Sequence, residues 1–164
     1  MKILSLLFIF VATFLSAEEL KIKALEYSGD QNKGISIFTG NVHMTKLEDE
    51  LIADKVTVYT DKENNPTKFV AEGNVSFKMT SEDGARYKGV SQKAIYLPNE
   101  KEYHFYIKAH LIQLDDHKEI MGDEVVFKSI EGKAFAKGAK DEPVIMIFDI
   151  KDDKKKKSTP KGDE

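Results

Sequence analysis

Alternation of apolar and polar residues is the feature that most limits how this chain can fold. Within residues 18–150, apolar side chains recur at every second position, as in Val75, Phe77 and Met79. A strand with one buried face has this period, whereas an amphipathic helix repeats every three to four residues. Further runs of this kind cover residues 20–24, 35–37, 56–58 and 103–107. Turn-forming residues separate the runs at short intervals. We therefore predict an all-β fold of many short antiparallel strands.

A short phrase recurs within the alternating region. Thr39-Gly40-Asn41-Val42 and Glu72-Gly73-Asn74-Val75 lie 33 residues apart, and each leads into an alternating run. Glycine and asparagine tolerate positive φ, so the phrase indicates a tight turn or a β-bulge that shapes the fold. A third copy lacks the pair, and Ala109-His110-Leu111 stands in its place. Repeats of this kind stack as supersecondary units around a shared core.

A second phrase follows the first. Residues 51–59 are echoed by residues 120–127, and Val42 and Leu111 each lie 12 residues before an aspartate, Asp54 or Asp123. We expect both aspartates to accept hydrogen bonds from turn amides. They are not expected to form a catalytic acid and base pair, because their repeat positions place them in different layers.

Residues 1–17 have the layout of a signal peptide. Lys2 precedes an apolar run of 13 residues (3–15), and Ser16 and Ala17 follow it, so we predict cleavage after Ala17. A membrane-spanning helix needs roughly 20 apolar residues, which makes a permanent anchor the less favoured interpretation. The chain also has no cysteine, which excludes disulfides and thiolate sites. Export without disulfides indicates the periplasm of a bacterial envelope.

The mature chain divides into one domain, residues 18–150, and a charged tail, residues 151–164. The domain length is typical of a single core. The tail contains Lys154 to Lys157 in a row, and we expect it to be disordered, either as a solubilising segment or in contact with an anionic membrane surface. The domain has 18 basic and 24 acidic residues, a net charge of 18 − 24 = −6. This balance argues against a nucleic-acid partner.

Motifs for catalysis or for cofactor binding are missing from the sequence. The four histidines, His43, His104, His110 and His117, are not spaced to share a metal. Nucleophile elbows, phosphate-binding loops and dinucleotide fingerprints are also absent. We therefore predict no enzymatic activity, no metal and no cofactor. What remains is apolar strand surface, including residues 144–150 with apolar side chains on both faces. Such surface fits a lined cavity and a filled core equally well.

The two phrases resemble the signature of the OstA-like family. The relevant segments are 38–44, 53–56 and 72–75, with a later echo at 122–125, and the resemblance extends from about residue 20 to residue 150. It implies a twisted, slightly open β-jellyroll whose interior is an apolar groove for the acyl chains of lipopolysaccharide. Two features depart from the family pattern, namely the missing third glycine-asparagine pair and the short loop at 61–66.

The resemblance also implies partners. Units of this family join head to tail, the C-terminal strand of one pairing with the N-terminal strand of the next. They form a bridge for lipopolysaccharide between the inner-membrane member LptC and the outer-membrane member LptD. Exposed strand edges, usually an aggregation hazard, would then be joints.

Groove-facing positions follow in two ways. Leu20 and Ile22 occupy positions where the first strand of the family faces lipid. Alternation alone adds Ile35, Ile37, Val42, Met44, Val56, Val58, Val75, Phe77, Phe105 and Phe127.

Three alternatives remain open on the sequence. The first is an LptC-like component that keeps its apolar N-terminus as an anchor in the inner membrane. The second is a lipocalin-like binder of a small apolar ligand, with strands closed into a monomeric barrel. The third is an envelope hydrolase that uses Asp54 or Asp123.

Overall fold

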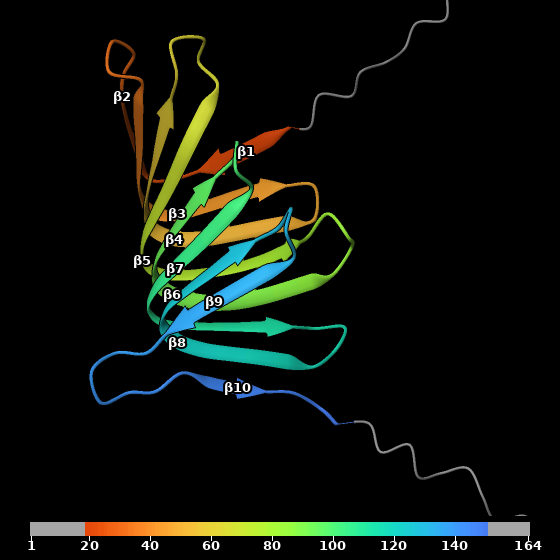
Figure 1. Cartoon of the computed structure of the whole chain (residues 1–164). Coiled ribbons are helices and arrows are strands. Elements are labelled where there is room, and N and C mark those ends of the chain that lie inside the picture. Colours follow the sequence, from red (N-terminus) through yellow and green to blue (C-terminus); the bar gives the residue numbers. More distant parts are fainter. Residues whose placement is uncertain (1–18, 151–164) are drawn as a thin grey trace, which may run out of the picture.

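The computed structural model describes residues 19–150, which form ten strands joined mostly by short turns (Figure 1). The strands are β1 (Leu20–Lys23), β2 (Glu26–Asp30), β3 (Ile35–Lys46), β4 (Asp49–Thr60), β5 (Pro66–Thr80), β6 (Arg86–Leu97), β7 (Glu102–Gln113), β8 (Lys118–Lys128), β9 (Lys133–Lys137) and β10 (Ile145–Ile147). In this range there is no helix long and apolar enough to cross a membrane. The predicted signal peptide, residues 1–17, and the predicted tail, residues 151–164, lie outside the described residues.

All strands belong to one antiparallel sheet in the order β1-β3-β4-β5-β6-β7-β8-β10. β2 pairs with the other half of β3, and β9 with the other half of β8. The sheet therefore stays open, and its short terminal strands lie at opposite ends of the molecule (Figure 1). The predicted all-β, slightly open fold is confirmed.

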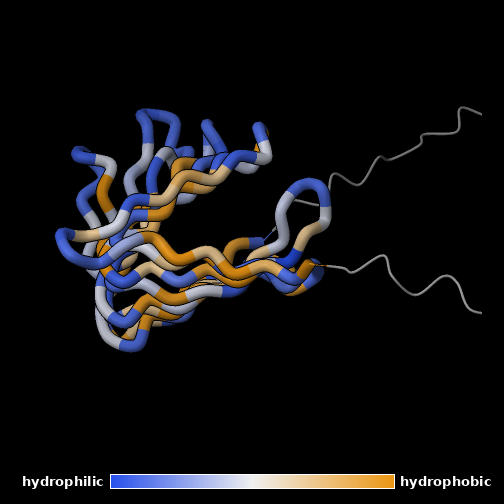
Figure 2. Tube along the Cα trace, turned by 60° about the horizontal axis from the view of Figure 1, so that its bottom comes forward, coloured by the Kyte–Doolittle hydropathy of each residue, from blue (hydrophilic) through white to orange (hydrophobic). Residues whose placement is uncertain are grey.

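The six long strands bend along one line. The pairing register shifts at the middle of each, for example between Thr39 and Val42 on β3 and between Glu72 and Val75 on β5. The bend divides the sheet into two arms. The β1 arm contains β1, β10 and residues 42–46, 49–53, 75–80, 86–91, 109–113 and 118–122; the β2 arm contains β2, β9 and residues 35–39, 55–60, 66–72, 93–97, 102–106 and 124–128. Figure 2 shows the two arms from the side, with hydrophobic residues along both.

Residues with positive φ form the bend on β3, β5 and β7. Gly73 and Asn74 have φ of 78° and 46°, and the equivalent pair on β3 is Gly40-Asn41. On β7 the pair is Ile107-Lys108, with φ of 63° and 56°. The predicted third copy, Ala109-His110-Leu111, was therefore misplaced by two residues. Neither side chain favours the left-handed region, so the sequence does not mark this bulge. Ile107 is 50% exposed there instead of continuing the buried face of its strand.

Asp54 stabilises the bend through a hydrogen bond between two side chains. Its Oδ2 accepts a hydrogen bond from Asn74 Nδ2 at 2.9 Å, between β4 and β5. The donor is thus a side-chain amide and not the backbone turn amide that the sequence predicts. Asp54 and Asp123 lie on β4 and β8, with three strands between them in the sheet, so the fold does not bring them together as a catalytic pair.

The hydrophobic core lies between the arms. On β4, β6 and β8 two consecutive polar residues at the bend, such as Asp54-Lys55, interrupt the alternation, so that apolar side chains on both sides of them point inward. The largest side chains that are almost fully buried are Val42, Val56, Val75 and Val125. The two arms of this one sheet thus cover each other's apolar faces, as the two separate sheets of a sandwich do.

Candidate functional site

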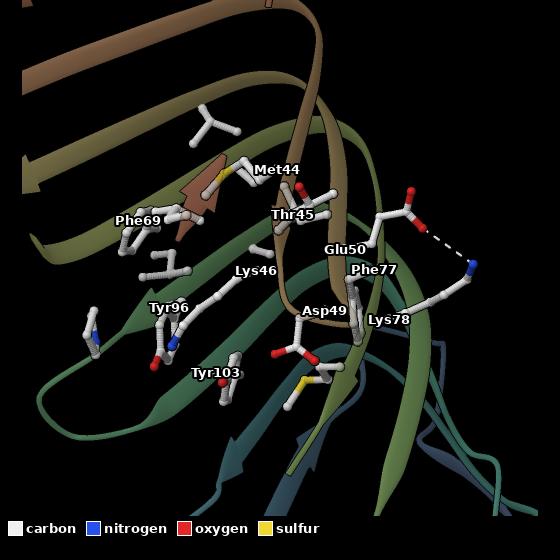
Figure 3. Close-up of a pocket in the computed structure, with 18 of the residues that line it drawn as sticks. Met44, Thr45, Lys46, Asp49, Glu50, Phe69, Phe77, Lys78, Tyr96 and Tyr103 are labelled. Carbon is white, nitrogen blue, oxygen red and sulfur yellow. Dashed lines mark ion pairs between the residues drawn. The ribbon is translucent and has the colours of Figure 1, made fainter. Parts of the chain in front are cut away.

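An apolar cavity of about 320 Å³ opens between the two arms on the side of β1 (Figure 3). Both arms line it. The β1 arm contributes Leu20, Met44, Leu51, Phe77 and Met79, and the β2 arm contributes Val56, Phe69, Ala71, Ala94, Tyr96, Tyr103 and Phe105. Because carbon atoms dominate the wall, the cavity suits an apolar ligand.

Polar groups gather at one part of this wall. Lys46 and Asp49 lie near the phenols of Tyr96 and Tyr103, and Figure 3 shows these side chains on the same side of the cavity. The rings of Tyr96 and Tyr103 stack with centroids 4.5 Å apart. Burial, together with the neighbouring Tyr96, raises the pKa of Tyr103 well above its usual range. The cavity therefore combines an apolar interior with polar groups that would suit a headgroup.

An aromatic row runs across the inner face of the β2 arm. Phe69 pairs with Tyr96, Tyr96 with Tyr103, and Tyr103 with Phe127, on four successive strands. Directly opposite residues in a sheet share one face, so all four rings face the β1 arm. Phe127 in turn meets Tyr87 of the β1 arm, with ring centroids 5.1 Å apart. The arms therefore touch on the β8 side and leave the cavity on the β1 side.

The structure places the twelve predicted groove residues in three groups. Five line the cavity: Leu20, Met44, Val56, Phe77 and Phe105. Five more belong to the core between the arms or pack against it: Ile22, Val42, Val58, Val75 and Phe127. Ile35 and Ile37 lie on the outer face, because they pair with Tyr59 and Thr57, whereas Val56 and Val58 point inward.

The reason for this placement of Ile35 and Ile37 is the bulge on β3. It leaves the alternation of that strand unchanged, so the inward positions of Val42 and Met44 continue upstream to Phe38 and Ser36. Phe38 pairs with Val56 and packs against the core. The prediction for Ile35 and Ile37 rested on their own short run. It did not take into account that on β3 the even-numbered residues, such as Phe38 and Val42, are the ones that point inward.

Several cavity residues were missed by the sequence analysis. Phe69, Tyr96 and Met79 line the cavity, as do Leu51 and Tyr103. Met79 and Tyr103 belong to alternating runs whose other members were selected, so the signal was available. For Phe69 and Tyr96, the cross-strand register was needed.

Three histidines, His43, His104 and His110, lie on the outer face of the sheet, and His117 lies in the turn between β7 and β8. His43 Nε2 lies 2.6 Å from Glu50 Oε1, and His110 Nε2 lies 2.8 Å from Glu119 Oε2. Hydrogen bonds from His43 and from Lys78 lower the pKa of Glu50. Within residues 19–150, no group of three or more potential metal ligands is found. These pairs are surface contacts between neighbouring strands; Glu50 also borders the cavity, whereas His43, His110 and Glu119 do not.

Comparison with known proteins assigns the fold and the family. The chain is similar to the crystal structure of LptH from Pseudomonas aeruginosa, described as the LptA-homologous periplasmic component of the lipopolysaccharide transport device. The TM-score is 0.71, with 17% sequence identity over 81% of this chain and 96% of that one. At this identity the similarity shows a common fold. A search of curated proteins finds no match in sequence.

A family model described as LptA/(LptD N-terminal domain) LPS transport protein matches residues 21–133. The match covers more than half of the chain and confirms the resemblance seen in the glycine-asparagine phrases. Members of this family are transport components and not enzymes. The chain therefore belongs to the LptA/LptD N-terminal domain family of lipopolysaccharide transport proteins.

Proposed function

We propose that this protein is a periplasmic carrier that holds the acyl chains of lipopolysaccharide between its two arms while the lipid moves from the inner to the outer membrane. The observation that carries the proposal is the apolar cavity, open between the arms and lined by Leu20, Met44 and Phe69. Each methylene buried there contributes about 0.8 kcal/mol, so a few acyl segments suffice for firm binding without covalent chemistry. Net movement then requires an energy source elsewhere.

The periplasmic location is part of the proposal. The predicted signal peptide supports it, and LptH, which has the same fold, is described as a periplasmic component. Sequencing the mature N-terminus separates this location from the LptC-like alternative, since cleavage after Ala17 releases the protein whereas an intact N-terminus anchors it. The open sheet favours both of these over a closed, lipocalin-like barrel.

Head-to-tail association through the sheet ends forms the second part of the proposal. Leu25 and Tyr27 are exposed at the β1 and β2 end, and Phe135, Ile145 and Ile147 are exposed at the β9 and β10 end. Both ends present short strands with unpaired backbone groups, which are templates for strand addition. A second copy, or the related domains of LptC and LptD, would continue the sheet and extend the apolar surface from one unit to the next.

Substitution of Leu20 tests lipid binding. Leu20→Glu places a carboxylate on the cavity wall, and we expect it to reduce the amount of lipopolysaccharide that co-purifies with the protein, measured by mass spectrometry. Lys21→Glu is the matched control, because Lys21 is the next residue on the same strand, is exposed and does not line the cavity. Equal lipid content in both variants would reject the cavity as the binding site.

Sedimentation velocity over a range of concentrations tests association. Wild-type protein should form larger species as its concentration rises, and Ile145→Lys combined with Ile147→Lys should prevent this by placing charges on the edge strand. Ile130→Lys serves as control, since Ile130 is equally apolar and exposed but lies in the turn before β9. Loss of association in the control as well would contradict the assignment of the joint.

A further inference from the structure

The cavity ends at a pair of stacked rings, one from each arm. Phe77 on β5 and Phe105 on β7 have ring centroids 4.3 Å apart and an interplanar angle of 15°. Both side chains are nearly buried, with exposures of 7% and 3%. Both border the cavity, whereas no described residue of β8 does. The two rings therefore belong to the wall of the cavity that faces β8.

Beyond the rings the interior is filled. Leu111, Val125 and Phe127 belong to the same core and are buried. Tyr87 closes the arms against Phe127 on this side. An apolar chain that enters from the β1 side consequently meets Phe77 and Phe105 before it reaches this filled part of the core.

Small residues on β6 explain why the two rings can meet. Gly89 lies directly opposite Phe77, and Ala94 lies directly opposite Phe105. A Cβ at Gly89 would be 2.5 Å from Cζ of Phe77, so that ring occupies space that any other residue would fill. β6 lies between β5 and β7 in the sheet, but its small residues leave space in which Phe77 of β5 and Phe105 of β7 can stack.

We infer that Phe77 and Phe105 form the end wall of the cavity and set the length of acyl chain that it accepts. This inference rests on the proposed function, because it assigns a specificity role within the same lipid site. The mechanism is steric. While the acyl chain is too short to reach the rings, each added methylene is buried in the cavity. Once the chain reaches the rings, further methylenes remain in water or fold back.

The test measures affinity against chain length. Saturated fatty acids from octanoate to stearate, each below its critical micelle concentration, displace a fluorescent fatty-acid probe from the full-length mature protein. For the wild type we expect affinity to rise about fourfold per methylene, which corresponds to about 0.8 kcal/mol, up to a limiting length. Beyond that length the rise should stop.

Two variants move the wall and one leaves it in place. Phe77→Leu and Phe105→Leu each replace one ring of the pair, from opposite arms, by a smaller side chain. Both should shift the limiting length to longer chains, and affinity should keep rising about fourfold per methylene up to the new limit. Phe69→Leu is the control, because Phe69 also lines the cavity but does not belong to the stacked pair. It should lower affinity for the ligands without moving the limit. Thermal melts establish that each variant is folded, and the two wall variants provide independent readings.

The outcomes separate the two proposals. A limiting length that stays unchanged in both wall variants, or that moves equally in Phe69→Leu, overturns the role of the ring pair and leaves the lipid site intact. Failure of the wild type to bind any fatty acid overturns the proposed function, and the inference falls with it.

Discussion

Replacing Gly73 by alanine tests the construction of the bend that separates the two arms. Gly73 has φ of +78°, and a Cβ there would lie 2.4 Å from Asp54 Oδ2 and 2.9 Å from Asp54 Cβ. A left-handed conformation costs an L-residue about 1–2 kcal/mol. Moving Asp54 also breaks its hydrogen bond with Asn74, a loss of about 0.5–1.5 kcal/mol. We expect Gly73→Ala to lower the free energy of unfolding by about 2–3 kcal/mol.

Gly84→Ala is the matched control. Gly84 has φ of +84°, but a Cβ at this position would meet no described atom within 4 Å. Only the left-handed conformation is then penalised, at about 1–2 kcal/mol. Urea unfolding followed by far-ultraviolet circular dichroism measures both variants, and the difference of about 1 kcal/mol corresponds to roughly 4 °C in Tm for a domain of this size.

Equal losses in the two variants would refute the contact between Gly73 and Asp54 as a determinant of the bend. A double-mutant cycle with Asp54→Ala sharpens the result. Without the Asp54 side chain beyond Cβ, the Cβ contact persists but the carboxylate contact and the hydrogen bond are gone. Gly73→Ala should then cost little more than Gly84→Ala, and the coupling between the two positions should appear as non-additivity.

Three further predictions concern the core and the bend. Burial raises the pKa of Tyr103, so the stabilisation it provides is complete below about pH 10 and declines as the pH rises above that value; Tyr103→Phe should flatten this alkaline decline in urea unfolding measured against pH, and an unchanged slope would contradict it. Lys108→Asn should stabilise the protein by about 0.5 kcal/mol, because asparagine tolerates the left-handed region better than lysine, and a lower Tm would count against strain at this bulge. Val56→Ala should cost about 2 kcal/mol and Ile37→Ala clearly less, since one side chain is fully buried and the other lies on the outer face; a reversed order in urea unfolding would overturn the face assignment.

The alternation of single strands was readable from the sequence, whereas their arrangement across the sheet was not. Val75 and Phe77 show their buried face within five residues of chain. The glycine-asparagine pairs also marked two of the three positive-φ bulges at the bend, because few other residues adopt positive φ. Ile107-Lys108 adopts the same conformation without the residues that signal it. That bulge is imposed by its neighbours in the sheet, which a local pattern does not contain.

The cavity depends even more on information between strands. Phe69, Tyr96 and Tyr103 lie on three different strands but form one row because the register aligns them. Ile35 and Ile37 alternate as regularly as Val56 and Val58 yet face outward, and only the parity across the bulge on β3 distinguishes them. A single sequence can therefore predict which strands have an apolar face. Which of those faces enclose a cavity depends on the register between strands, which the local pattern does not contain.

The bend and the cavity have a common physical origin. On β4, a polar pair at the bend, Asp54-Lys55, allows apolar side chains before and after it to point toward the same interior. A single sheet can then bury its own apolar face without a second sheet. At β8 the two arms meet, because Tyr87 reaches Phe127 across the gap. At the β1 side the terminal strand is short and the inward rings of Phe69 and Tyr96 have no aromatic partner on the opposite arm among the residues described. Apolar surface left uncovered in this way favours whatever ligand can complete the core, which is why an acyl chain suits this end of the fold.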